Sequence, residues 1–77
     1  AGLDEITRGA LMTLRADGFG AEDRRWFASA VLPCLVPIVG FLPDGPRAER
    51  LGEAKAMAAR ESDRVVREAL SSFVSAK

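Results

Sequence analysis

The chain has 77 residues, with eleven basic side chains, eleven acidic side chains, one cysteine and no histidine. A single cysteine excludes an intrachain disulfide, and the lack of histidine removes the commonest metal ligand. The zero net charge removes the long-range attraction that draws proteins to nucleic acid, so we expect no nucleic-acid partner. Residues 1–77 form one small helical domain at most. A core of this size contributes only about 3–5 kcal/mol to the free energy of unfolding unless a disulfide, a metal or a partner adds to it. We therefore expect a partner: a second copy, a larger complex or a membrane.

Residues 3–15 have the apolar spacing of an amphipathic α-helix. Apolar residues at helical intervals form one stripe: Leu3, Ile6, Ala10, Leu11 and Leu14. Asp4 and Glu5 stand at its start, where the helix dipole favours negative charge. The pattern predicts a short amphipathic helix that stops before Gly18.

The next segment begins as a helix with acidic residues in its first turn and then meets Pro33 and Pro37. A proline inside a helix removes one hydrogen bond and clashes with the carbonyl four residues earlier. We therefore expect a regular helix to about Leu32, then either a kinked continuation or an irregular apolar segment through Leu42. A short strand has no second strand to pair with, so we expect no sheet.

A strong turn signal at residues 42–46 precedes the last element, because proline and glycine suit the special backbone angles of turns. The following pattern predicts one long helix from Pro46 to about Ala76, roughly 45 Å at 1.5 Å per residue. Two opposite-charge pairs lie four residues apart on its outer side: Asp63 with Arg67, and Arg64 with Glu68. The fold predicted is all-α with three helices: a short amphipathic one, an apolar proline-kinked one and a long C-terminal amphipathic one.

The stretch Trp26–Leu42 carries no charge, and its length lies between a buried core helix and a minimal bilayer span. Trp26 beside Arg24 and Arg25 is typical of a membrane-interface anchor, whereas flanking helices could equally shield the run as a core. Both interpretations stay open, as a core or membrane segment. Either one depends on the same residues: Trp26, Phe27, Leu32, Pro33, Pro37 and Phe41.

Within this run three short apolar segments each contain one proline: Ser29-Ala30-Val31-Leu32-Pro33, Val36-Pro37-Ile38-Val39-Gly40 and Phe41-Leu42-Pro43. This resembles the start of the small photosystem I subunit VIII, which implies the first part of a membrane span. That family continues with a second apolar half. Here the chain turns instead to Asp44-Gly45-Pro46-Arg47, so the resemblance ends at residue 43 and does not assign the chain to that family.

The residue types needed for catalysis are scarce. Without histidine or tyrosine, no nucleophile and base are available as a pair. Cys34 has no charged residue within eight positions to lower its pKa, so we expect a buried small hydrophobe rather than a reactive thiol. The sequence therefore predicts a protein that is not an enzyme and binds neither a cofactor nor a metal.

The long C-terminal helix carries a stripe of small residues in its first half, and small residues allow helices to approach closely. We expect this stripe to bind a partner chain through six residues: Leu51, Ala54, Ala58, Val65, Ala69 and Phe73. The function expected is a non-enzymatic small helical subunit that mediates protein–protein assembly, as a homo-oligomer or in a larger complex. The alternative is a membrane-associated accessory subunit of a photosynthetic or respiratory complex, anchored by residues 26–42. The compartment stays open between intracellular soluble and membrane-associated.

Overall fold

A computed structural model describes residues 2–16 and 18–75, and within these ranges the chain forms five α-helices and no strand. They are α1 (Gly2–Arg15), α2 (Ala21–Ala30), α3 (Leu32–Gly40), α4 (Asp44–Arg60) and α5 (Arg64–Ser75). The all-α prediction is confirmed. The prediction of three helices is wrong, because both longer elements are interrupted. The predicted end of the last helix, at Ala76, lies outside the described residues.

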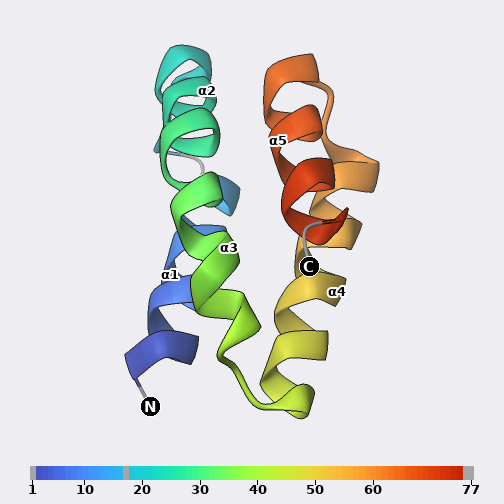
Figure 1. The fold of residues 1–77 in the computed structure, drawn as a ribbon. Helices are drawn as coiled ribbons and strands as arrows, with labels where there is room; N and C mark the ends of the chain where they lie inside the picture. Colours follow the sequence, from blue (N-terminus) through green and yellow to red (C-terminus); the bar gives the residue numbers. More distant parts are fainter. Residues whose placement is uncertain (1, 17, 76–77) are drawn as a thin grey trace.

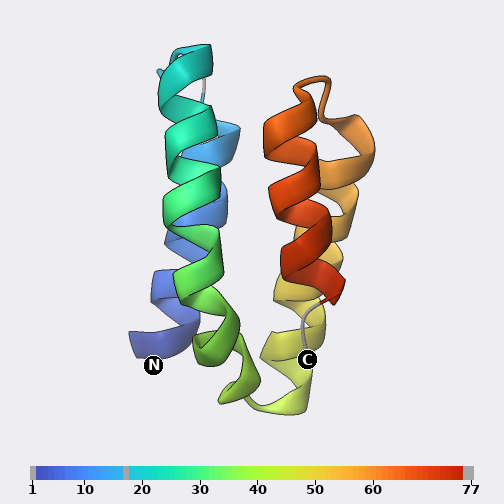
Figure 2. The ribbon, with the colours of Figure 1, turned by 45° about the horizontal axis from the view of Figure 1, so that its top comes forward.

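The helices form two antiparallel pairs that pack side by side (Figures 1 and 2). In one pair α1 lies behind a rod made of α2 followed by α3; in the other α4 lies behind α5. The pairs meet where α2 and α3 contact α5 and where α1 contacts α4. The radius of gyration is 11.4 Å, close to the value of about 11.5 Å expected for a folded chain of this length.

The break between α2 and α3 falls at Val31, two residues before Pro33. Pro33 stands in the first turn of α3, where its missing N–H is not needed, whereas Pro37 lies inside α3. Val31 keeps right-handed helical angles, φ −91° and ψ −44°, so α3 continues the direction of α2. The regular helix therefore ends earlier than Leu32, and the continuation is helical rather than irregular.

The expected long helix is divided at Glu61–Asp63, and the two parts fold back on each other as α4 and α5. Asp63 starts α5, because its carboxylate accepts hydrogen bonds from the backbone N–H groups of Val65 (2.9 Å) and Val66 (3.2 Å). The predicted pair of Arg64 with Glu68 forms, at 3.1 Å. The carboxylate of Asp63 is used for this cap and for another arginine instead of Arg67. A straight helix of 45 Å would also exceed the longest dimension of the molecule, 32 Å.

The core lies between the two helix pairs. It contains eleven buried apolar residues of the described chain: Leu11, Leu14, Ala28, Leu32, Leu35, Val39, Leu42, Ala54, Val66, Leu70 and Phe73. The apolar run 26–42 supplies five of these, so one side of that run belongs to the core. The predicted helix 3–15 is confirmed as α1, but only its inner side is covered, since Leu3 and Ile6 remain exposed.

One charged side chain is buried with the core. Arg50 of α4 is 5% exposed and lies near three carboxylates, those of Asp4 (3.6 Å), Glu49 (2.8 Å) and Glu53 (3.5 Å). The pair with Asp4 joins α4 to α1. The pairing of Arg50 is incomplete, because its Nε and Nη1 atoms and Oδ1 of Asp4 are buried without a hydrogen-bond partner.

Candidate functional site

The most unusual surface of the molecule is the outer side of the α2–α3 rod. Between residues 26 and 41 the exposed residues of the rod also include Ser29 and Gly40. Six exposed residues at helical spacing form what we call the outer face: Trp26, Ala30, Pro33, Cys34, Pro37 and Phe41. Trp26 and Phe41, at its two ends, expose 67% and 78% of their surfaces. These are the two most exposed large apolar side chains in the part of the chain that the structure describes.

The outer face carries no charge along its whole length, because the sequence has none between Trp26 and Leu42. Single exposed apolar residues are common on protein surfaces, but a contiguous apolar patch usually marks an interaction site. Cys34 belongs to this face and is exposed, so the prediction that it is buried is wrong. The core side of α3 is taken by Leu32, Leu35 and Val39, and position 34 points away from all three.

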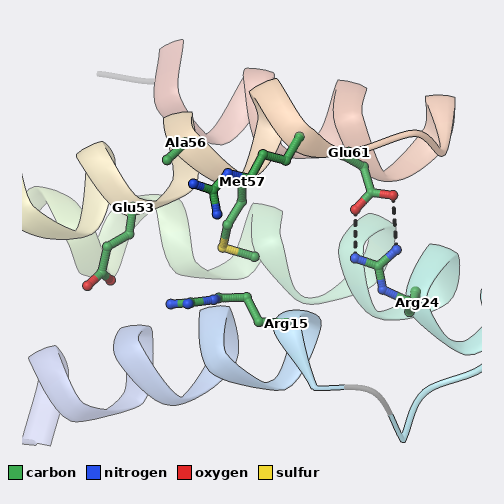
Figure 3. A pocket seen from close by; sticks show the side chains of 7 residues that line it. Arg15, Arg24, Glu53, Ala56, Met57 and Glu61 are labelled. Atoms are coloured by element: carbon green, nitrogen blue, oxygen red, sulfur yellow. Dashed lines mark hydrogen bonds and ion pairs between the residues drawn. The ribbon is translucent and has the colours of Figure 1, made fainter.

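The two arginines that precede the outer face point away from it and are engaged within the chain. Arg24 forms two hydrogen bonds with the carboxylate of Glu61, at 2.6 and 3.0 Å (Figure 3). Its guanidinium also donates to the carbonyl of Leu14 at the end of α1, at 3.1 and 3.2 Å. Arg25 pairs with Asp63 at 2.7 Å. Arg24 and Arg25 thus hold the start of α2 against α1 and against the α4–α5 turn.

A second candidate is a depression of about 400 Å³ between the C-terminal ends of α1 and α4 (Figure 3). Its lining is mostly charged and includes Arg15, Arg24, Glu53, Ala56, Met57, Arg60 and Glu61. Arg15 extends beneath the thioether of Met57, toward the side of Glu53. Glu53 and Glu61 are already paired with Arg50 and Arg24, so the depression offers no free carboxylate for acid–base work.

The electrostatics of the α4–α5 turn follow from these contacts. The hydrogen bonds from Arg24 lower the pKa of Glu61, and the hydrogen bond from Arg25 lowers the pKa of Asp63. Further hydrogen bonds from backbone N–H groups, that of Asp63 to Glu61 and those of Val66 and Val65 to Asp63, act in the same direction. Both carboxylates are therefore more stable as anions in the folded chain than in the unfolded one.

We expect the fold to weaken in acid for this reason. On unfolding, Glu61 and Asp63 return to their ordinary pKa values of 4.5 and 3.8, so below about pH 5 the unfolded state binds more protons. The free energy of unfolding should therefore fall as the pH drops through 4.5 and below. Urea titrations at pH 7, 4 and 3 measure this. A Glu61→Gln variant should lose less stability over the same interval, and an equal loss would contradict the account.

No arrangement for catalysis or metal binding is visible among the described residues. Three or more acidic or cysteine side chains do not come together there in a group that could hold a metal ion. The thiol of Cys34 is exposed and donates to the carbonyl oxygen of Ala30 at 3.3 Å.

The residues expected to bind a partner through the C-terminal helix are divided between α4 and α5. Ala54 and Phe73 are buried in the chain's own core, at 0% and 3% exposure. Three others, Leu51, Ala58 and Ala69, are half-buried and pack against that core. Only Val65 is exposed, at 43%. The structure does not bring these six together on one outward surface.

The residues expected in the core or membrane segment also separate, according to the side of the rod. Leu32 is buried and Phe27 is half-buried, with its ring edge-on to that of Phe19 at 5.9 Å. The other four, Trp26, Pro33, Pro37 and Phe41, lie on the outer face. In the described part of the chain, every helix is too short or too polar to span a bilayer. The sequence did not predict that exposed and covered residues alternate along the run, because the run has no charged residue to mark its exposed side.

Comparison of the chain with known protein families, curated proteins and solved structures gives no match.

Proposed function

We propose that this protein is a non-enzymatic helical module for protein–protein assembly, and that the outer face of α2–α3 is its docking surface. The observation that carries the proposal is the uncharged outer side of a rod that ends in two exposed aromatic residues. Aromatic side chains and a lack of charge characterise the centres of protein interfaces. The proposed docking surface therefore lies on the α2–α3 rod and not on the C-terminal helix that the sequence predicted, where most of the expected residues are turned inward.

A protein partner suits this face better than a lipid surface. Helices that lie on membranes combine an apolar face with many lysine or arginine residues that attract anionic lipids. Here the charges balance, and the two nearest arginines, Arg24 and Arg25, are held in pairs with Glu61 and Asp63. The membrane-associated alternative therefore has the apolar surface but lacks the electrostatic attraction.

The proposal is tested by photo-crosslinking in cells that produce the protein. A photoreactive phenylalanine analogue replaces Trp26, and in a control variant it replaces Lys55, an exposed residue of α4. We expect protein adducts from position 26 and few from position 55. Adducts with lipid alone would support the membrane-associated alternative. Equal labelling at both positions would contradict a docking role for the outer face.

A further inference from the structure

We propose that the depression between the C-terminal ends of α1 and α4 binds a small organic phosphate, whose phosphate group lies between Arg15 and Arg60. The lining of this depression includes no residue of the outer face. The site is therefore separate from the docking surface, and the inference goes beyond the proposed function.

Two arginines that are not used elsewhere in the described chain meet at this depression. Arg15 belongs to the last turn of α1 and Arg60 to the last turn of α4, and both line it. Neither forms an ion pair with a described residue. Five other arginines are each paired with a carboxylate: Arg24, Arg25, Arg47, Arg50 and Arg64.

The negative charges in the lining already have cationic partners. Glu61 accepts two hydrogen bonds from Arg24, and Glu53 lies 3.5 Å from Nε of Arg50. Neither carboxylate depends on Arg15 or Arg60 for neutralisation. The two free guanidinium groups therefore give the depression an excess of positive charge.

The two helix ends oppose an anion only weakly. A helix C-terminus carries about half a negative charge, which lies on its unbonded carbonyl groups. At the end of α1 the carbonyl of Leu14 accepts from Arg24, and that of Thr13 accepts from the N–H of Ala16 at 3.2 Å. At the end of α4 the carbonyl of Ala58 accepts from the N–H of Glu61 at 3.3 Å. The full charges of two guanidinium groups exceed what remains.

The chemistry of the lining favours a phosphate that carries an apolar group. Guanidinium groups bind phosphate oxygens through pairs of parallel hydrogen bonds. A phosphate monoester carries about −1.5 to −2 charges near pH 7, which matches two arginines, whereas a carboxylate carries one. Ala56 and the thioether of Met57, which lies over Arg15, supply an apolar wall (Figure 3). The volume of about 400 Å³ is in the range of small-molecule sites.

The two methionines of the chain allow a local test by NMR of the full chain labelled with ¹³C at the methionine methyl groups. Met57 lines the depression, whereas Met12 is 56% exposed on α1 and lies outside the lining. The probe is hexyl phosphate, added at constant low ionic strength. We expect a saturable shift of the Met57 methyl signal with a dissociation constant of about 1–10 mM, because both arginines are exposed to solvent. The Met12 signal should change little.

Matched probes and variants decide which groups bind. Hexanol has the alkyl chain without the phosphate, and hexanoate has a single charge, so both should bind at least about threefold more weakly. Arg15→Gln and Arg60→Gln should each raise the dissociation constant of hexyl phosphate at least about fivefold. Arg67→Gln removes the same charge from an exposed position of α5 outside the lining and should leave it unchanged. Circular dichroism checks that each variant is folded.

Three results would overturn the inference. One is a Met57 signal that does not shift, or that shifts together with Met12 and without saturation. Another is binding of hexanol or hexanoate as tight as that of hexyl phosphate. The third is unchanged binding of hexyl phosphate in folded Arg15→Gln and Arg60→Gln chains.

Discussion

Replacing Leu70 with alanine is expected to unfold a large fraction of the protein at 25 °C. Leu70 is fully buried in α5, within the core that joins the two helix pairs. Truncation of a buried leucine costs about 2–5 kcal/mol, because apolar contacts are lost and a cavity remains. A core of this size contributes only about 3–5 kcal/mol, so the variant has little stability left.

The measurement is the free energy of unfolding from urea titrations followed by circular dichroism, at one fixed protein concentration. Val65→Ala is the matched control in the same helix. Val65 is 43% exposed, and its truncation should cost less than about 1 kcal/mol. Equal and small losses in both variants would show that α5 does not pack as described.

The second large effect is expected at Arg24, whose replacement with alanine should cost about 2 kcal/mol. This guanidinium donates to Glu61 and to the Leu14 carbonyl, so it joins α1, α2 and the α4–α5 turn. The Glu61 side chain is only 8% exposed, and removing its partner leaves a largely desolvated carboxylate. The 24% exposure of the Arg24 side chain reduces the cost below that of a fully buried pair.

A double-mutant cycle isolates this interaction. Arg24→Ala, Glu61→Gln and the double variant should give a coupling energy of about 1 kcal/mol or more in urea unfolding. Arg64→Ala is the control, because the pair of Arg64 with Glu68 is exposed on both sides and should contribute less than about 0.5 kcal/mol. A coupling energy near zero would mean that Arg24 and Glu61 do not act together.

The all-α class and α1 could be predicted from the sequence because they depend on local signals. Helical spacing of apolar residues, acids in the first turn and the absence of strand candidates all act within a few residues. The paired charges Arg64 and Glu68 were also predictable, since a helix brings residues four apart together.

The break between α4 and α5 was harder to predict, because residues 46–76 keep a helical spacing throughout. Two signals were present: the change from small to large apolar residues along the stripe, and Ser62-Asp63 ahead of Val65 and Val66. Aspartate is a preferred N-cap, and here it starts a new helix that folds back over α4. Whether such a cap interrupts a helix depends on tertiary packing, which spacing alone does not reveal.

The outer face was missed for a different reason. A run without charge looks uniformly buried, and its interpretation as core or membrane left no place for an exposed apolar side. Only the packing of α1 and α5 against Leu32, Leu35 and Val39 shows which side stays uncovered. Cys34 was predicted to be buried on the same grounds, and it lies near the middle of the uncovered side.

The central claim, that the outer face is a docking surface for a protein, is tested most directly by photo-crosslinking at Trp26 in cells that produce the protein. Trp26 is the only tryptophan and is 67% exposed in the single chain. We expect adducts with protein from a photoreactive phenylalanine analogue at position 26 and few from the same analogue at position 55. Equal labelling at both positions, or adducts with lipid alone, would contradict the claim.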